Sequence, residues 1–243
     1  MAVLFDNRMS QPQICVIVPT LNEVENIRFL INGIMENLPG YFVHIFIVDD
    51  GSTDGTTESV PPLKVGFDVE IINRESRIGF GSALADGFKT ALQLKPSFVV
   101  TMDADLSHDP SEIPNLLAKS GPGVVVVGSR YIDGGSYDDF GLFRKLESYT
   151  ANWLADRYLV RGVSDCTSGF RCYSQDDIEA ILPRLNSVGY DIQVELLFHA
   201  HKLGYTVAET PIRFRKRHGG KSKLGLIEIL RFVNLLIRLK FYQ

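Results

Sequence analysis

Short runs of apolar residues alternate with longer amphipathic segments through the first half of the chain. Continuous apolar runs of this length are typical of strands that are buried on both faces of a parallel sheet. They predict strands at residues 14–18, 44–48, 69–72, 98–102 and 123–127. Amphipathic segments predict one helix between the first two strands, ending near Met35, and another over residues 79–94. This alternation predicts an α/β fold, with a mainly parallel, Rossmann-like sheet and helices on both faces.

The second half of the chain has a less regular pattern. Helices are predicted over residues 144–159 and 191–203. Residues 205–214 resemble a strand, in which Pro211 suits an edge position because proline cannot donate a ladder hydrogen bond. The single tryptophan, Trp153, lies on the first of these helices and is expected in the core.

No linker divides the chain. We therefore expect one domain over residues 1–225, of which residues 1–12 are an N-terminal tail. The remaining residues, 226–243, belong to an apolar segment that predicts an amphipathic helix. Its polar residues recur at spacings of three or four and form one stripe: Glu228, Arg231, Asn234 and Arg238. Such a stripe beside a broad apolar face is typical of a helix in the membrane interface, but it also fits a helix packed on the domain core or on a partner subunit.

Polar residues follow three of the predicted strands at their carboxyl ends. These are residues 19–23 (PTLNE), the pair Asp49 and Asp50, and the pair Asp103 and Asp105. In open α/β sheets, ligands bind outside the carboxyl ends of the strands. We therefore expect a binding site where these segments converge. Asn22 is in addition a candidate to cap the helix that follows it.

Asp103 and Asp105 stand one residue apart, directly after a buried strand. Because residues i and i+2 of a strand point to the same side, both carboxylates can reach one divalent cation. Mg²⁺ and Mn²⁺ prefer oxygen ligands and usually bridge to substrate phosphates. The alternative is a solvated turn with helix-capping aspartates, a role that suits Asp109 in front of Pro110. The position after an apolar strand favours the metal site.

Gly79 and Gly81 begin a predicted helix and partly match a dinucleotide-binding pattern. The pattern G-x-G-x-x-G/A needs a small residue at its last position, where this chain has Leu84. We therefore favour a simpler interpretation, a helix start that a phosphate or another stretch of backbone can approach closely.

Basic residues gather in the second half, although the whole chain has a net charge of −4 and a pI of about 5.8. The overall charge gives no reason to expect nucleic-acid binding. Arg144 and Ser148 are four residues apart, so on a helix they share a face and could hold one phosphate. The basic run at residues 213–223 contains two glycines and suits a loop that closes on phosphates. A solvated basic face is the alternative in both places.

The three cysteines, Cys15, Cys166 and Cys172, are too few and too scattered for a disulfide framework and indicate a reducing compartment. The first residues lack the pattern of a signal peptide, and no stretch of about 20 apolar residues indicates a membrane span. We therefore expect a cytoplasmic protein.

The order of several motifs resembles that of the family 2 glycosyltransferases, which have the GT-A fold. These motifs are residues 19–23 (PTLNE), 48–56 (VDDGSTDGT), 103–106 (DADL) and 128–131 (GSRY). Within that family the chain is most similar to the dolichol-phosphate, or polyprenyl-phosphate, mannosyltransferases. The narrower likeness comes from Arg144-x-x-x-Ser148, residues 168–171 (SGFR), Glu195 and the pattern of residues 211–223. The resemblance covers roughly residues 13–225.

The resemblance implies roles for the matching positions. The nucleotide-sugar donor, GDP-mannose, would be bound by Pro19, Thr20, Asn22, Glu23, Asp50, Asp103, Arg217 and Lys223. Asp103 and Asp105 would hold Mg²⁺ or Mn²⁺, with Ser107 as a further candidate ligand where several relatives have glutamine. The acceptor phosphate would be bound by Arg130, Arg144 and Ser148. Asp103, Asp105 and Arg217 are the expected catalytic residues.

The resemblance further implies an inverting transfer of mannose to a polyprenyl phosphate, with a β-linked product. A lipid acceptor implies a peripheral protein at the cytoplasmic face of a membrane, with a membrane-anchoring partner subunit as a further possibility. Two alternatives remain open: transfer of glucose from UDP-glucose or use of another glycan acceptor, and a silent scaffold subunit. The intact Asp103, Asp105 and Arg217 argue against a scaffold.

Overall fold

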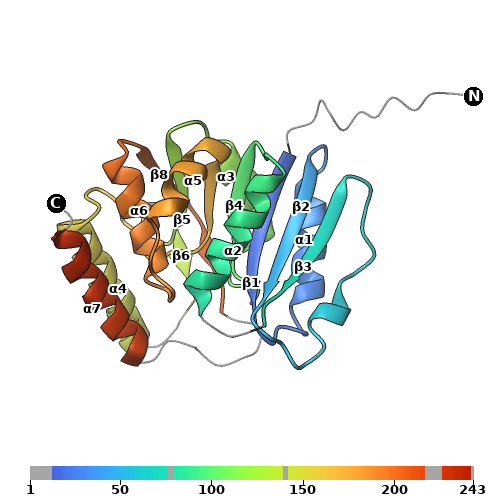
Figure 1. Ribbon diagram of the computed structural model, residues 1–243, viewed down its shortest axis with the longest axis horizontal. Coiled ribbons are helices and arrows are strands. Elements are labelled where there is room, and N and C mark those ends of the chain that lie inside the picture. Colours follow the sequence, from blue (N-terminus) through green and yellow to red (C-terminus); the bar gives the residue numbers. More distant parts are fainter. Residues whose placement is uncertain (1–12, 76–78, 139–141, 217–225, 242–243) are drawn as a thin grey trace, which may run out of the picture.

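The computed structural model of the protein describes residues 13–75, 79–138, 142–216 and 226–241, and the side chains of residues 142–147 and 226 lie outside this description. Its centre is a sheet of seven strands: β1 (Gln13–Thr20), β2 (Phe42–Asp49), β3 (Phe67–Asn73), β4 (Phe98–Thr101), β5 (Val124–Ser129), β7 (Arg171–Ser174) and β8 (Thr206–Pro211). Their order is β3-β2-β1-β4-β7-β5-β8 (Figure 1). Neighbours are parallel except for β7, which runs antiparallel to β4 and β5. The predicted mainly parallel sheet is confirmed.

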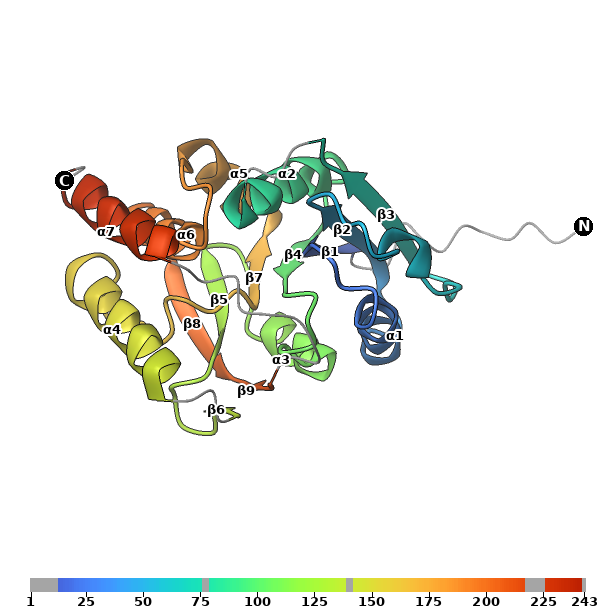
Figure 2. The same ribbon diagram turned by 90° about the horizontal axis from the view of Figure 1, so that it is seen from below.

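Helices cover both faces of this sheet (Figure 2). The α-helices are α1 (Ile27–Asn37), α2 (Phe80–Gln93), α3 (Ile113–Leu117), α4 (Leu142–Tyr158), α5 (Gln175–Ile181), α6 (Ile192–Lys202) and α7 (Leu226–Lys240). Short 3₁₀ helices are η2 (Thr57–Ser59), η3 (Pro110–Glu112) and η4 (Leu182–Arg184), and a small second sheet pairs β6 (Ser136–Tyr137) with β9 (Arg213–Phe214). Helices α1 and α3 pack on one face, and α2, α5 and α6 pack on the other.

The packing of strand β1 explains why its residues 14–18 form a continuous apolar run. Ile14, Val16 and Val18 enter the core with α1, whereas Cys15 and Ile17 enter the core with α2, and all five are fully buried. A strand with both faces covered by helices has no solvated side, so a continuous apolar run replaces the usual alternation.

Three local expectations are wrong. Helix α1 begins at Ile27 rather than next to Asn22, whose backbone is left-handed (φ 55°) and whose side chain binds another loop. Trp153 is 57 % exposed, because α4 lies at the periphery of the molecule (Figure 2). The segment predicted as one strand at residues 205–214 is divided, since β8 ends at Pro211 and β9 pairs with β6 instead. The edge position of Pro211 is confirmed, because β8 is the last strand of the sheet.

Helix α7 attaches to the domain through its polar stripe. The Glu228 carboxylate accepts a hydrogen bond of 3.0 Å from the Tyr190 N–H, and Arg238 donates to the buried carboxylate of Glu195. Leu235 and Leu239 are buried beside these contacts. The segment forms a helix, as expected, and its Glu228 and Arg238 side chains face the protein, whereas Asn234 of the same stripe is exposed. No helix in the described ranges is long and apolar enough to cross a membrane.

Candidate active site

The carboxyl ends of the parallel strands form one edge of the sheet. The last residues of β1 and β2, Thr20 and Asp49, are register partners. Strand β4 ends at Thr101, which pairs with Ile17 of β1, so Asp103 follows toward the same edge. Because β7 is antiparallel, it begins at this edge, with Arg171 paired to Thr101. The Thr101 hydroxyl donates a hydrogen bond of 2.7 Å to the carbonyl of Gly169. Residues 165–170 therefore reach the same edge as the predicted aspartates, which the sequence pattern did not indicate.

The loops after β1 and β2 are joined by reciprocal hydrogen bonds. The Asn22 N–H donates to the Ser52 hydroxyl at 2.8 Å, and the Thr53 N–H donates to the Asn22 side-chain oxygen at 2.9 Å. The Glu23 N–H donates to the Thr56 hydroxyl at 2.8 Å. Since Asn22 has a left-handed backbone, its amide and side chain both face the neighbouring loop.

These loops bring the candidate nucleotide residues Pro19, Thr20, Asn22, Glu23 and Asp50 to one end of the sheet. Asn22 holds the loops together through its side chain. Contact of any of these five residues with a nucleotide stays a prediction.

Arg74 is a site residue that sequence reasoning missed. It directly follows β3, and its guanidinium pairs with Asp50, donates to Asp86 at 3.1 Å and donates to the Ser82 hydroxyl at 2.5 Å. Asp50 is therefore held in a fixed position at the sheet edge. The signal was available, because Arg74 is the first residue after β3, as Asp50 is the first residue after β2.

Asp103 and Asp105 lie on a tight turn after β4. The Asp105 carboxylate is 4 % exposed and accepts a hydrogen bond of 3.0 Å from the Ser107 N–H. Leu106, which lies between Asp105 and Ser107, has φ 61°. This left-handed conformation costs free energy for a branched residue and often marks functional sites. The His108 Nδ1 atom accepts a hydrogen bond from the Asp103 N–H at 3.0 Å. Burial lowers the pKa of His108, although Asp103 and Asp105 oppose this shift, and its ring serves to fix the turn.

The turn carries oxygen atoms suited to a hard cation. The Ser107 hydroxyl is fully buried and makes no hydrogen bond to any residue in the described ranges. No cluster of three or more His, Cys, Asp and Glu side chains forms a metal site in the part of the chain that the structure describes. The donor set is thus two carboxylates and one unpaired hydroxyl, which is oxygen chemistry of the kind that Mg²⁺ and Mn²⁺ prefer. Asp109 takes the expected capping role, accepting a hydrogen bond from the Ser111 N–H.

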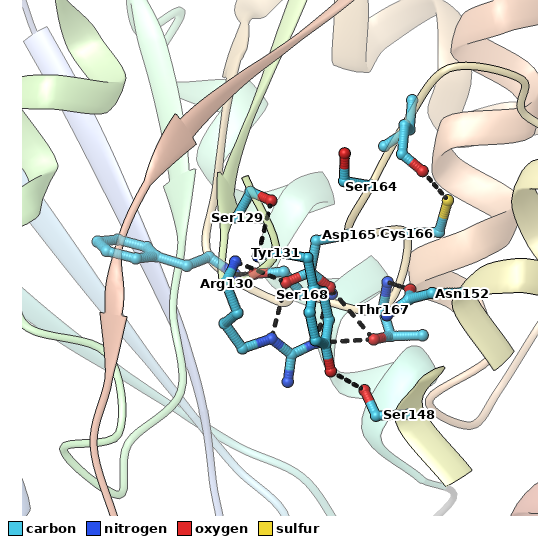
Figure 3. Close-up of polar contacts among 12 residues, drawn as sticks. Ser129, Arg130, Tyr131, Ser148, Asn152, Ser164, Asp165, Cys166, Thr167 and Ser168 are labelled. Atoms are coloured by element: carbon cyan, nitrogen blue, oxygen red, sulfur yellow. Dashed lines mark hydrogen bonds and ion pairs between the residues drawn. The ribbon is translucent and has the colours of Figure 1, made fainter. Parts of the chain in front are cut away.

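Arg130 and Asp165 form a second buried ion pair at this edge (Figure 3). The Arg130 side chain donates to the two Asp165 carboxylate oxygens at 2.7 and 2.6 Å and to the Thr167 hydroxyl at 2.8 Å. Burial would raise the pKa of Asp165, but the adjacent Arg130 guanidinium and its hydrogen bonds hold that pKa below its usual range. Asp165 therefore fixes Arg130, and it is a second residue that sequence reasoning missed.

Ser148 reaches the same cluster from α4. The Tyr131 hydroxyl donates to the Ser148 hydroxyl at 2.8 Å (Figure 3). Ser148 thereby keeps its own proton available for donation to a ligand. A hollow of about 400 Å³ adjoins this pair and is lined by Tyr131, Tyr149, Asn152 and Trp153 among others.

Several predicted site residues lie outside the described residues. Arg217 and Lys223 fall in residues 217–225, and the Arg144 side chain is in the part of α4 that is not described. The structure brings Arg130 and Ser148 together, and it does not test Arg144, Arg217 or Lys223.

The glycines before α2 serve close backbone packing. The Gly81 N–H donates to the Val188 carbonyl at 2.8 Å, and a Cβ atom on Gly81 would lie 2.6 Å from the Gly189 carbonyl oxygen. The dinucleotide pattern is not needed to explain them, because the approaching group is the loop before α6.

The comparison with known proteins agrees with this architecture. Residues 15–206 match the family described as glycosyl transferase family 2. The chain is 38 % identical over 214 residues to the polyprenol monophosphomannose synthase of Mycolicibacterium smegmatis, covering 86 % of this chain and 80 % of that protein. It is 32 % identical over 216 residues to the undecaprenyl-phosphate mannosyltransferase of Micrococcus luteus, covering 88 % of each.

Solved structures show the same fold. Glucosyl-3-phosphoglycerate synthase from Mycobacterium tuberculosis, in a complex with Mn²⁺, UDP and glucosyl-3-phosphoglycerate, has a TM-score of 0.63 and 21 % identity, covering 96 % of this chain and 80 % of that one. The fold is therefore that of the GT-A glycosyltransferases, as the motifs predicted. The chain belongs to glycosyl transferase family 2, and it is a glycosyltransferase.

Proposed function

We propose that this enzyme transfers mannose from GDP-mannose to a polyprenyl phosphate and inverts the anomeric carbon to give a β-linked product. The observation that carries the proposal is the pairing of two clusters at one sheet edge. Asp103 and Asp105 supply carboxylate oxygens after the end of β4. Arg130 and Ser148 supply N–H and O–H donors for an anion at the same edge. The names of the two curated relatives, a polyprenol monophosphomannose synthase and an undecaprenyl-phosphate mannosyltransferase, support mannose as the sugar and a polyprenyl phosphate as the acceptor.

A divalent cation, Mg²⁺ or Mn²⁺, would be held by Asp103, Asp105 and Ser107. The buried, unpaired Ser107 hydroxyl supports this assignment, since such a group is costly without a partner. When bound, the cation would neutralise charge on the donor diphosphate. Asp50, fixed by Arg74, would contact the nucleotide together with Pro19, Thr20, Asn22 and Glu23, and the two residues in the undescribed segment, Arg217 and Lys223, would close on the phosphates.

The acceptor needs little activation. A phosphate monoester has a second pKa of about 6 and is largely dianionic near neutral pH. The task of Arg130 and Ser148, with Arg144, is therefore to hold that phosphate in line with the anomeric carbon. Arg130 has one edge occupied by Asp165, so it would bind the phosphate through its remaining nitrogen, Nη1.

A membrane surface would present the lipid acceptor. Helix α7 contacts the domain through Glu228, Arg238 and the buried Leu235 and Leu239. On its other side it exposes apolar side chains: Ile227, Leu230, Val233 and Ile237. Helix α4 lies beside α7 in both views and adds the exposed aromatic residues Tyr149 and Trp153 (Figures 1 and 2). We place this surface in the interface of the cytoplasmic leaflet, or against a membrane-anchoring partner, with the hollow beside Trp153 as the path for the polyprenyl chain.

The test is transfer of labelled mannose from GDP-mannose to a polyprenyl phosphate, with Mg²⁺, with Mn²⁺ and with a chelator. UDP-glucose runs in parallel as the alternative donor. Cation-dependent label in the lipid from GDP-mannose is the expected result. If only UDP-glucose labels the lipid, glucose replaces mannose in the proposal. If neither donor labels the lipid, the proposed acceptor is contradicted.

A further inference from the structure

Gln193 is a buried amide without a hydrogen-bond partner. It lies in the first turn of α6 and is 3 % exposed. Neither its side-chain oxygen nor its nitrogen bonds to any residue in the described ranges. Buried amides are almost always paired, because removing them from water unpaired is costly. Since both atoms lack partners, the amide is unsatisfied whichever way it is turned, and it calls for a ligand.

The Gln193 amide lies close to Asp103. The point where a Cβ atom of Gly169 would lie is 3.2 Å from Gln193 Nε2 and 3.3 Å from Asp103 Oδ1. Any side chain at position 169 would therefore fill the space between the amide and the carboxylate. Because residue 169 is glycine, no side chain separates the Gln193 amide from the Asp103 carboxylate.

The main chain of Gln193 is held firmly in this position. The fully buried Arg171 guanidinium donates to the Gln193 carbonyl at 2.6 Å. The same guanidinium donates to the carbonyls of Ser168 and Cys166, both at 2.8 Å. Arg171 thus joins α6 to the segment that carries Gly169, so the unsatisfied amide is aimed by a rigid framework.

We propose that Gln193 binds adjacent hydroxyl groups of the donor sugar and helps to determine which sugar is transferred. This proposal rests on the proposed function, which places a nucleotide sugar beside Asp103. An amide offers a donor and an acceptor side by side, and two neighbouring hydroxyls offer the same pair in return. A sugar ring therefore satisfies both orphan atoms at once.

Two other roles fit the amide less well. A phosphate would accept from the nitrogen but would leave the Gln193 oxygen unpaired and next to negative charge. General base catalysis is excluded chemically, because a neutral amide does not take up a proton near neutral pH. Gln193 is thus a specificity-determining residue that acts by hydrogen bonding.

The proposal is tested with Gln193→Met, which keeps length and volume but removes both polar atoms. The matched control is Gln93→Met at an exposed position near the end of α2. Titration calorimetry with Mg²⁺ compares binding of GDP with binding of GDP-mannose, and the same titrations use UDP and UDP-glucose. GDP-mannose analogues that lack one ring hydroxyl complete the set.

Gln193→Met is expected to bind GDP within about twofold of the wild type and GDP-mannose about 5- to 50-fold more weakly, as the loss of two hydrogen bonds predicts. At least one deoxy analogue should bind the wild type more weakly than GDP-mannose does. The same analogue and GDP-mannose should bind Gln193→Met with equal affinity. The ligand-free variant should melt at the same or a higher temperature, because the unpaired amide is gone. A purely structural role would instead lower the melting temperature and weaken GDP and GDP-mannose alike.

The results also separate this inference from the proposed function. If the wild type prefers UDP-glucose, GDP-mannose is the wrong donor. The role of Gln193 is then tested by comparing the binding of UDP-glucose and of UDP to the wild type and to Gln193→Met. Unchanged sugar-nucleotide binding in Gln193→Met would overturn the inference, as would a wild type that gains no affinity from either sugar. Neither of those outcomes would bear on transfer to a lipid.

Discussion

The Asp165 carboxylate is fully buried and grips Arg130 through two hydrogen bonds, of 2.6 and 2.7 Å. It also accepts the Arg130 N–H at 3.0 Å and the Ser168 N–H at 3.1 Å. One side chain thus joins the end of β5 to the segment before β7. The arginine proposed to hold the acceptor phosphate takes its position from an aspartate that no ligand needs to touch.

Replacing Asp165 by asparagine should lower both stability and acceptor affinity. Removing one partner of a buried ion pair leaves the other charge uncompensated, and we expect a loss of about 3 kcal/mol because Arg130 retains some solvent contact. Urea denaturation measures this, with Asp68→Asn on the exposed side of β3 as the control. The KM for the polyprenyl phosphate should rise more than the KM for the donor. Equal stability of Asp165→Asn and Asp68→Asn would contradict the role of the pair.

The same carboxylate should make stability depend on acid pH. Its pKa is depressed in the folded protein by Arg130 against the opposing effect of burial, and an unfolded aspartate titrates near pH 3.9. The contribution of Asp165 to the free energy of unfolding is therefore complete above the pKa that the residue has in the unfolded chain. It is lost as the pH falls toward the lower pKa that it has in the folded protein. The free energy of unfolding of the wild type should fall more steeply than that of Asp165→Asn between about pH 5 and 3. Parallel curves for the two proteins would show that Asp165 titrates normally.

Asp105→Asn should abolish transfer, whereas Asp109→Asn should not. Asp105 is buried in the turn after β4, and the amide would remove one of the negative oxygens proposed to hold the cation. Asp109 lies four positions later and only caps η3 and pairs with the exposed Arg215. We expect a decrease in kcat of more than about 100-fold for the first variant and less than about threefold for the second. Activity of Asp105→Asn near the wild-type level would remove the cation site from the proposal.

Gly87→Ala should destabilise the fold without touching the site. A Cβ atom at Gly87 would lie 2.4 Å from Ile17 Cγ2 and 3.1 Å from Val48 Cγ2, so α2 would have to move away from the sheet. Overpacking of this kind costs about 1–3 kcal/mol. Gly121→Ala is the control, because a Cβ atom there meets nothing within 4 Å. The two melting temperatures should differ by several degrees, and equal values would show that the helix can shift freely.

The sequence allowed the strands of the first half to be predicted, because each is a continuous apolar run with both faces buried. It did not reveal β7, a strand of four residues that begins with the buried Arg171. A charged residue in a short strand carries no apolar signal, and its partners are backbone carbonyls that only the fold brings near. Asp165 and Gln193 were missed for a similar reason. They lie at this edge because the antiparallel β7 begins here and its Arg171 bonds to the neighbouring Cys166 and Gln193 carbonyls. The two aspartates and Ser148 could be predicted as site residues because their signal lies in short spacings along the chain.

Helix α7 should bind membranes through its exposed apolar stripe. Leu230 and Ile237 are 61 % and 54 % exposed, although the polar stripe of the same helix is attached to the domain. Burial of each side chain in the interface would contribute about 1.5–3 kcal/mol, so Leu230→Glu with Ile237→Glu should lower binding to phosphatidylglycerol vesicles by at least about tenfold. Phe29→Glu, at an exposed apolar position on α1, is the control and should bind like the wild type.

Trp153 reports this binding directly, because it is the only tryptophan and lies exposed on α4 beside α7. Its fluorescence should shift to shorter wavelength when vesicles are added to the wild type and to Phe29→Glu, and should shift little for the double variant. Transfer to a lipid acceptor in vesicles should fall with binding, while transfer to a short, water-soluble polyprenyl phosphate should not, since the active edge is unchanged. Vesicle binding that survives both acidic substitutions would place the membrane contact elsewhere. If the two acidic substitutions instead abolished self-association of the protein, the apolar stripe would be assigned to a protein partner.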